Sequence, residues 1–400
     1  MHIVTSTDIL LPRAEDMGAW SVIACDQFTS EPEYWAAAEA RAAEKPSTLS
    51  LMLPEAWLHT ARADGADGRI ADTMRRYLAE GVFQTVPDSF IYVERTLSDG
   101  RVRRGLVAAL DLEQYDFTGT QHTSVRSTEG TVEERLPPRV NIRRSAPLEM
   151  PHTLLLMDDR TDSVLSLAEK AKDTLEKVYD FDLMLGGGHI AGWRVSGETK
   201  AAVQSALDAL DNAALQREKY GDAAENGKLT FAVGDGNHSL AAAERFWEEK
   251  RETLPENERE TDPARFALVE IENIHEPSLD FEPIHRVIFD TDTSAFAAEF
   301  TAHRTEWEAK EKTLGERVAA AESFCRAYIA AHGGYIDYIH GDDTARSLGE
   351  KPNCAAVLLP PVEKSGLFLS VLKNGALPKK SFSMGNARDK RYYLECRKIR

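Results

Sequence analysis

Short apolar runs alternate with amphipathic stretches along almost the whole chain. The apolar runs predict strands at residues 8–12, 20–27, 153–159, 264–274, 281–289, 333–340, 354–360 and 366–372. Apolar residues spaced three and four apart predict helices from about residue 31 and at 162–180, 199–211, 295–302 and 313–331. This interleaving predicts an α/β protein with a mixed sheet.

Two segments are typical of β-hairpins. Residues 89–112 alternate around Asp99-Gly100, a pair favoured in two-residue hairpin turns. Residues 181–195 repeat the pattern around a run of three glycines. No helix is expected directly after that run, so we interpret it as a structural turn and His189 as a strand residue.

The stretch at 228–245, KLTFAVGDGNHSLAAAER, predicts a strand, a turn and a helix. The turn carries Asp235, Gly236, Asn237, His238 and Ser239. A strand that passes through a glycine turn into a helix presents free backbone N–H groups and the positive end of the helix dipole, which suits an anion. The turn lacks the P-loop Lys-Ser/Thr pair and the three-glycine dinucleotide spacing. The alternative is a plain connection in which Asn237 or Ser239 only caps the helix.

Asp26 and Gln27 are expected on a loop after the second apolar run. A carboxylate and an amide in such a position are candidates for catalysis and for ligand binding. The alternative is that Asp26 caps the helix beginning near Glu31. We interpret Cys25 as a small buried hydrophobe, because no base lies near it in the sequence.

Residues 119–152 are expected to form a long basic loop, because they show little helical or strand periodicity. Such loops are often lids or binding segments. The arginines proposed to contact phosphate are Arg126, Arg135, Arg139 and Arg143. The alternative is a solvated surface balanced by Glu129, Glu133 and Glu134.

Two further polar groups are candidate anion contacts. His285 and Arg286 begin an expected strand, and Lys380 and Ser381 lie in the C-terminal segment PKKSFSMG. The alternatives are strand-end residues and a flexible basic turn.

Charge and composition narrow the classes of partner. The 400 residues are 42% hydrophobic and 28% charged, as in an ordinary globular protein, and the formal net charge is -18. This charge argues against nucleic-acid and anionic-membrane partners, so a small anionic ligand would need a local basic pocket. The four cysteines form no C-x-x-C motif, which favours a reducing cytoplasm.

The N-terminus has no pattern of a signal peptide, so an unprocessed cytoplasmic protein is expected. The length exceeds one typical domain. We predict a main α/β domain over residues 1–283 and a smaller C-terminal α/β subdomain over residues 284–400, whose last loop returns to the site.

Six segments carry a family resemblance: ACDQFTSEPEYW, KPSTLSLMLPE, RVNIRRSAPLEMPH, FAVGDGNHSLAAA, PIHRVI and KKSFSMGNARDKRYYLECRKI. Together they resemble the bacterial and archaeal domain-of-unknown-function family 1015, which implies a fold and a site but no established reaction. Many relatives carry D-G-H-H-R where this chain has Asp235 to Ser239, so a cation must come from another segment. The turn is also similar to that of ParB-like nucleotide-binding proteins, including free-serine kinases.

These observations predict a phosphate-binding enzyme. The leading hypothesis is nucleotide-dependent phosphoryl transfer to a small metabolite, with Mg²⁺ and a nucleotide as cofactors. Asp235 would bind the metal or act as a base, Asp26 is the competing carboxylate, and His238 would orient a phosphate or move a proton. A phosphatase or nucleotide hydrolase and a noncatalytic nucleotide or metabolite sensor are the alternatives. A hydrolase relying on metal alone is disfavoured, because the chain has no H-E-x-x-H motif.

Overall fold

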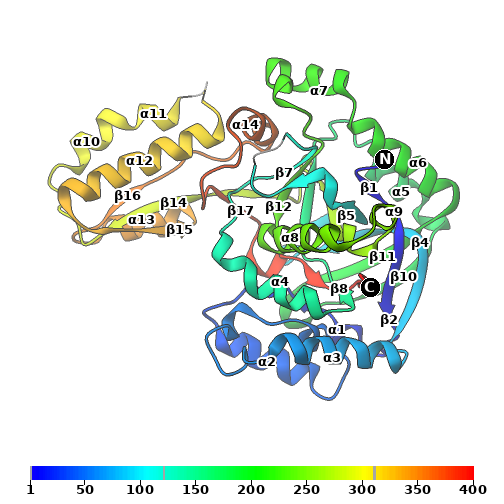
Figure 1. Ribbon diagram of the computed structural model, residues 1–400. Coiled ribbons are helices and arrows are strands. Elements are labelled where there is room, and N and C mark those ends of the chain that lie inside the picture. The colour runs from blue at the N-terminus through cyan, green and yellow to red at the C-terminus, as the bar shows by residue number, and fades with distance from the viewer. Residues whose placement is uncertain (1, 120–121, 310–311) are drawn as a thin grey trace.

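The computed structural model describes residues 2–119, 122–309 and 312–400. A large mixed sheet forms its centre, with helices on both faces (Figure 1), which confirms the α/β class. In spatial order the main strands are β10 Glu176–Asp182, β11 His189–Val195, β4 Phe83–Thr96, β5 Val102–Asp111, β13 Phe266–Asn273, β9 Leu154–Met157, β12 Phe231–Asp235, β7 Val125–Ser127 and β6 Tyr115–Asp116. Two further strands, β1 Val4–Thr5 and β2 Thr7–Pro12, pair with β5 and β4.

Fourteen α-helices lie in the described part of the chain. They are α1 Met17–Trp20, α2 Pro32–Ala42, α3 Ala66–Ala79, α4 Leu136–Ser145, α5 Leu165–Ala171, α6 Gly197–Leu210, α7 Ala213–Tyr220, α8 Asn237–Thr253, α9 Glu256–Arg259, α10 Phe296–His303, α11 Thr305–Glu308, α12 Leu314–His332, α13 Asp342–Gly349 and α14 Leu367–Asn374. Single 3-10 turns occur at Thr48–Leu51, Glu55–Trp57, Leu112–Gln114, Glu133–Arg135, Lys172–Thr174, Met184–Gly186, Gly221–Asn226, Pro263–Arg265, Lys364–Gly366 and Ala387–Asp389. None of the described helices is long and apolar enough to cross a membrane.

Both predicted hairpins are present. Strands β4 and β5 pair antiparallel, with Ile91 opposite Val107. Strands β10 and β11 pair around the glycine run, with Asp182 opposite His189. His189 is a strand residue, as expected, and its ring nitrogens lie 2.8 Å and 2.7 Å from carboxylate oxygens of Asp182 and Asp180.

Three sequence predictions of local structure are wrong. Residues 136–145 form helix α4 instead of an irregular loop, because its prolines fall in the first turn, where a missing N–H costs nothing. Residues 367–374 form helix α14 instead of a strand, since a short apolar run does not by itself distinguish the two. Residues 176–182 form strand β10 and not the end of a helix.

The strands at the centre of the sheet are buried on both faces. Alternate residues of β4 enter separate cores, with Phe90 and Tyr92 on one face and Ile91 and Val93 on the other. The first face packs against α5, α6 and α8, and the second packs against α1, α2, α3 and the C-terminal segment. This second face positions the site described below.

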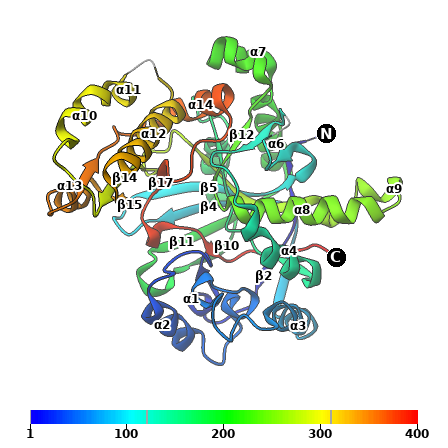
Figure 2. The ribbon, with the colours of Figure 1, turned by 60° about the vertical axis from the view of Figure 1, so that its left-hand side comes forward.

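A smaller, separate sheet is built around one long strand. Strand β14 Phe281–Phe289 pairs with β15 Tyr335–His340, β16 Ala355–Val357 and β17 Phe382–Met384. This sheet and helices α10 to α13 lie at one side of the large sheet in both views (Figures 1 and 2). The predicted division at residue 283 falls inside β14 and stays a prediction.

The C-terminal residues return to the first half of the chain. Strand β18 Tyr392–Tyr393 pairs with β3 Val22–Ile23, and β19 Arg397–Lys398 pairs with β8 Leu148–Glu149. Residues 386–398 therefore lie on the second face of the large sheet, between the sheet and the N-terminal helices.

Buried ion pairs fix this C-terminal segment on the sheet. The guanidinium of Arg391, 2% exposed, contacts the carboxylate of Glu270 and lies 2.5 Å from Glu395 Oε2. Tyr179 donates a 2.6 Å hydrogen bond to the other oxygen of Glu395. Gly105 lies two residues from Val107, the β5 partner of Glu270, and a Cβ at Gly105 would collide with the carboxylate of Glu270. Glycine there makes room for the carboxylate.

The turn between β12 and α8 also depends on a glycine. Gly236 has a φ of 77°, and a Cβ at this position would lie 2.8 Å from Thr153 Cα. The backbone before β9 therefore passes directly against the turn.

Replacing Arg391 with Met should destabilise the protein by about 3–5 kcal/mol, because two buried carboxylates would lose their shared cation. The free energy of unfolding in urea, followed by fluorescence, measures this loss. Arg217→Met is the control, because Arg217 pairs with Glu225 at 3.1 Å on the surface, with side chains 69% and 66% exposed. Its expected effect is below about 1 kcal/mol. Equal effects of the two substitutions would contradict the prediction.

Replacing Gly236 with Ala should cost more than the same change at another positive-φ glycine. Gly197 begins helix α6 with a φ of 59°, and a Cβ there meets no atom within 4 Å. Gly197→Ala measures the backbone strain alone, whereas Gly236→Ala adds a clash with Thr153 worth about 1–3 kcal/mol. Urea midpoints of both variants test the difference, and a Gly236→Ala variant as stable as Gly197→Ala would refute it.

Candidate functional site

The first turn of helix α8 is open at its N-terminus. Gly236 occupies the capping position, and no side chain of the described residues caps the helix, so the capping alternative for Asn237 and Ser239 is wrong. The amides of Asn237 and His238 have no hydrogen-bond partner in the described part of the chain. Free amides at the start of a 17-residue helix, at the positive end of its dipole, form a corner whose geometry suits an anion.

Asp235 ends strand β12 directly below this corner. One carboxylate oxygen accepts a 3.0 Å hydrogen bond from the amide of Gly236, and the other lies 3.2 Å from Nζ of Lys390. Asn237 presents a buried side-chain oxygen that has no partner among the described residues. The corner thus joins a carboxylate, an amide oxygen and a lysine.

His238 is held as a neutral imidazole. Its Nε2 accepts a hydrogen bond from the amide of Val132 at 3.2 Å, so the proton of the neutral ring lies on Nδ1. Burial, together with the charges of Arg139 and Arg135, lowers its pKa to about 4. Near neutral pH, His238 is therefore a hydrogen-bond donor at Nδ1.

Asp26 lies in the turn after β3. Its Oδ1 accepts a 3.0 Å hydrogen bond from Gln27. Burial opposes its ionisation, but nearby His152, this hydrogen bond and Lys390 hold the pKa of Asp26 below its ordinary value. Helix α2 begins after Glu31 with no side-chain cap from the described residues, so the capping alternative for Asp26 is also wrong.

A hydrogen-bonded chain that we did not predict runs beside the turn. His152 Nε2 lies 3.1 Å from Ser239 Oγ, and His152 Nδ1 lies 2.9 Å from the hydroxyl of Tyr393. That hydroxyl is also 3.5 Å from the amide of Cys25. Burial raises the pKa of the Cys25 thiol to about 12, in agreement with the interpretation of Cys25 as a hydrophobe.

Sequence reasoning missed His152, Tyr393 and Lys390, although the segments that carry them were noted. His152 ends the motif RVNIRRSAPLEMPH, and the other two lie in DKRYYLEC. These segments lie far from the turn in sequence. His152 reaches the turn because β9, which follows it, pairs with β12, whereas Tyr393 and Lys390 reach it because β18 pairs with β3.

The predicted arginines divide into two groups. Arg139 contacts Glu55, and the exposed Arg135 lies one helical turn before it, so both lie near His238. Arg126 instead donates to the carbonyls of Thr123, Asn226 and Lys228, and Arg143 pairs with Glu149 at 2.6 Å. These two arginines are engaged in holding the backbone and a buried carboxylate.

His285 and Arg286 lie within the smaller sheet. Both have fully buried side chains on β14. His285 lies 2.9 Å from Asp342 and accepts a 3.1 Å hydrogen bond from the amide of Leu359. Arg286 lies 3.3 Å from Glu322. These partners place both residues in the interior of the smaller sheet's own unit.

Lys380 and Ser381 border the site through Glu129. The amide of Ser381 donates a 3.2 Å hydrogen bond to Glu129, while the hydroxyl of Ser381 donates to the carbonyl of Pro378. Burial raises the pKa of Glu129, against the opposing charge of Lys380, and Asp235 is near enough to raise it further.

A buried carboxylate lies behind Lys390. Glu272 on β13 is fully buried, and its Oε1 lies 2.8 Å from Nε of Arg103. Burial raises the pKa of Glu272, while the charges of Arg103 and Lys390 oppose the rise. Lys390 therefore pairs with Asp235 and also acts electrostatically on this buried carboxylate.

A cavity of about 150 Å³ opens beside the turn and is called the apolar cleft below. His152, Ser239 and Tyr393 form its polar edge. Its apolar lining consists of Cys25, Leu51, Met52, Leu53, Leu58, Met74, Pro138, Ile142, Ala146, Leu148, Met150 and Ala242, and its charged lining of Glu55, Arg139, Arg143 and Glu149.

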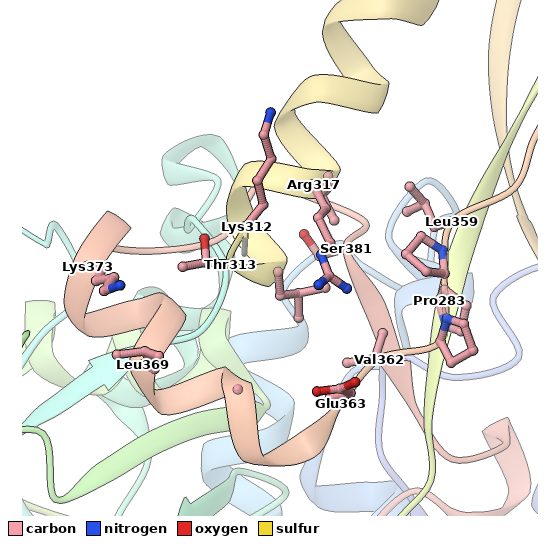
Figure 3. Close-up of a pocket in the computed structure, with 15 residues that line it drawn as sticks. Pro283, Lys312, Thr313, Arg317, Leu359, Val362, Glu363, Leu369, Lys373 and Ser381 are labelled. Carbon is pink, nitrogen blue, oxygen red and sulfur yellow. The ribbon is translucent and has the colours of Figure 1, made fainter. Parts of the chain in front are cut away.

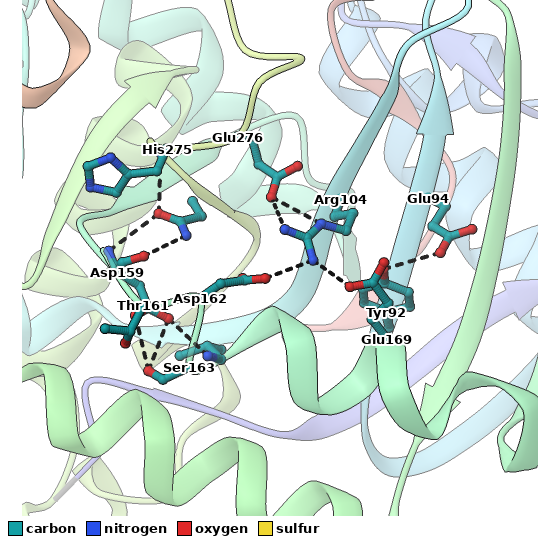
Figure 4. Close-up of polar contacts among 12 residues, drawn as sticks. Tyr92, Glu94, Arg104, Asp159, Thr161, Asp162, Ser163, Glu169, His275 and Glu276 are labelled. Atoms are coloured by element: carbon teal, nitrogen blue, oxygen red, sulfur yellow. Dashed lines mark hydrogen bonds and ion pairs between the residues drawn. The ribbon is translucent and has the colours of Figure 1, made fainter.

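Two other polar regions lie outside this site. Figure 3 shows a cavity of about 190 Å³ between α12 and α14, which Ser381 borders and Arg317 and Lys373 line. Figure 4 shows Arg104 between Glu276, Asp162 and Glu169 on the first face of the large sheet. We interpret this second group as an ionic tie between β5 and the residues around α5.

Among the described residues, no group of three or more His, Cys, Asp or Glu side chains is arranged to hold a metal ion by itself. A metal at the turn would therefore need oxygen atoms from elsewhere, such as an amide side chain or the ligand.

Comparisons with known proteins give one family and several distant structures. No curated protein sequence matches the chain. A conserved hypothetical protein from Pyrococcus furiosus is 10% identical, with a TM-score of 0.32 and coverage of 73% of this chain and 95% of that chain. Free serine kinase in complex with AMP is 10% identical, with a TM-score of 0.34 and coverage of 72% and 90%. A point mutant of free serine kinase in complex with ADP is 8% identical, with a TM-score of 0.34 and coverage of 72% and 91%.

The family comparison covers nearly the whole sequence. Residues 7–398 match the model described as "Protein of unknown function (DUF1015)", as the six motifs implied. This chain is therefore a member of the DUF1015 family.

Proposed function

We propose that this protein is a phosphate-binding enzyme that transfers a phosphoryl group from a nucleotide to a small metabolite. The open first turn of α8 is the observation that supports it most directly. Its free amides lie among cations from distant segments, namely Lys390, Arg135 and Arg139. In a protein with a net charge of -18, such a gathering suits an anionic group.

Phosphoryl transfer needs little covalent chemistry from a protein. It needs fixed positive charge around the transferred group and a carboxylate beside the acceptor hydroxyl. Amides of Asn237 and His238 and the ammonium of Lys390 would contact phosphate oxygens. Nδ1–H of His238 would donate one further hydrogen bond, which needs no proton transfer because the ring is already neutral.

The two carboxylates take different roles in this proposal. Asp26, whose pKa is held low, is ionised near neutral pH and would accept the hydrogen bond of the acceptor hydroxyl. Asp235 would orient Lys390 and hold Mg²⁺. The donor set fits this ion, because the orphaned side-chain oxygen of Asn237 adds a second oxygen ligand and Mg²⁺ takes its remaining ligands from phosphates and water. Bound Mg²⁺ would neutralise charge on the phosphates.

The pH dependence of stability tests whether His238 is a neutral imidazole. We expect the ring to stay neutral down to about pH 4, with its proton on Nδ1, because burial and two arginines disfavour the cation. The unfolded chain binds this proton at about pH 6.5, so stability should decrease as pH falls from about 6.5 to about 4. ¹⁵N NMR of histidine-labelled protein measures the pKa and the tautomer. His238→Gln should make the stability profile shallower over this window, and a ring that titrates near pH 6.5 would contradict the prediction.

The change in Tm on addition of a nucleotide tests the proposed function. A nucleotide at 100 times its Kd should stabilise the protein by about 2.7 kcal/mol, measured as a rise in Tm with and without Mg²⁺. Lys390→Met should reduce this rise. Lys398→Met is the matched control, because Lys398 is exposed on β19. If ATP, ADP, CTP, GTP and pyrophosphate all leave Tm unchanged, the proposed function is wrong.

Asp235→Asn separates the enzyme from a noncatalytic sensor. We expect it to lose the Mg²⁺-dependent part of the rise in Tm and to lower turnover about 100-fold or more, while nucleotide binding without Mg²⁺ persists. If Asp235→Asn leaves nucleotide binding unchanged and the wild-type protein shows no turnover with any acceptor, the sensor is supported. Release of phosphate from ATP at equal rates with and without an acceptor would support the hydrolase.

A further inference from the structure

The apolar cleft extends the site in one direction. Ser239 belongs to the first turn of α8, and its hydroxyl also lies at the edge of the cleft. If a ligand places a phosphorylated or phosphate-accepting group at the open amides, the rest of that ligand therefore reaches the cleft within a few bonds. The cleft thus selects the part of the ligand that does not react.

The lining of the cleft suits hydrocarbon. Its charged groups are already in ion pairs, since Glu55 contacts Arg139 and Glu149 is paired with both Arg143 and Arg397, and Nε of Arg143 is the one buried charged-group atom of its lining that has no hydrogen-bond partner among the described residues. A nucleobase needs unengaged donors and acceptors along its edge. The polar edge of the cleft, Ser239, His152 and Tyr393, is engaged in its own hydrogen-bonded chain.

The size and softness of the cleft limit the group that fits. About 150 Å³ equals the volume of an engineered protein cavity that admits benzene. Three methionines, Met52, Met74 and Met150, give the wall flexible and polarisable side chains that adapt to aliphatic or aromatic groups.

We infer that the phosphate acceptor is a small alcohol with one compact hydrocarbon group, which lies in the apolar cleft. This inference rests on the proposed function. The hydroxyl oxygen of the acceptor would form a bond to the γ-phosphorus of a nucleoside triphosphate, and the bond from that phosphorus to the bridging oxygen of the diphosphate would break. The hydroxyl proton would pass to Asp26 and then to water. The products are a nucleoside diphosphate and a phosphate monoester.

Calorimetric titration with three probes tests the inference. Benzyl phosphate resembles the expected product, inorganic phosphate lacks the hydrocarbon, and AMP carries a nucleobase in its place. We expect benzyl phosphate to bind about tenfold or more tightly than inorganic phosphate, because the phenyl ring leaves water. Equal affinities of these two probes would overturn the inference while leaving phosphate binding intact. Failure of all three probes to bind would instead count against the proposed function.

Two variants locate the hydrocarbon. Ala242→Leu fills the cleft from α8, and Leu58→Lys places a charge at a half-buried position of its wall. Each should remove the advantage of benzyl phosphate and leave the affinity for inorganic phosphate unchanged. Ala202→Leu on an exposed position of α6 is the control and should keep the advantage. If either cleft variant keeps the advantage, or if Ala242→Leu weakens AMP instead of benzyl phosphate, the cleft does not hold the hydrocarbon of the acceptor.

Discussion

The buried contact between Arg391 and Glu270 is the constraint on which the site depends. It attaches the C-terminal segment to the centre of the large sheet, where a misplaced charge would be costly. Lys390 and Tyr393 flank this arginine closely in sequence, so its position determines theirs. Lys390 then lies against Asp235, and Tyr393 against His152. The last residues of the chain thereby complete a site whose floor comes from the middle of the sequence.

Charge balance limits the kind of anion that the proposed site would bind. The chain is strongly acidic as a whole, so an extended polyanion would be repelled by most of its surface. At the turn, the cations come one at a time from α4 and from the C-terminal segment. Carboxylates of Glu55, Asp235 and Glu272 lie close to these cations and hold their side chains in place. The local positive region is therefore small and fixed, which suits one phosphate group better than a charged polymer or surface.

The sequence pattern correctly predicted the elements whose formation depends on local interactions. The strand, glycine turn and helix around Asp235, both hairpins and strand β14 follow from alternation and turn residues, and all are present. Helix α4 was missed because its apolar stripe is short and its remaining positions are prolines, arginines and small polar residues. Lys390 and His152 could not be located from sequence, because they reach the turn only through long-range pairing, of β18 with β3 and of β9 with β12. For the same reason His285 and Arg286 looked like site residues, although their partners lie within the smaller sheet.

The apolar cleft connects the choice of acceptor to the choice between transfer and hydrolysis. Water reaches an open phosphate site easily, so a transferase must make its acceptor a better partner than water. Binding energy from a nonreacting part of a substrate can position the reacting group. A hydrocarbon group in the cleft would supply that energy beside Ser239 and would displace water from the same place. Because its pKa is held low, Asp26 remains ionised to accept the acceptor's hydroxyl hydrogen bond, and the neutral ring of His238 adds no charge that would have to be neutralised. In the proposed function, the cleft and the turn would therefore act as one site, in which apolar burial selects the acceptor and fixed charge stabilises the transferred group.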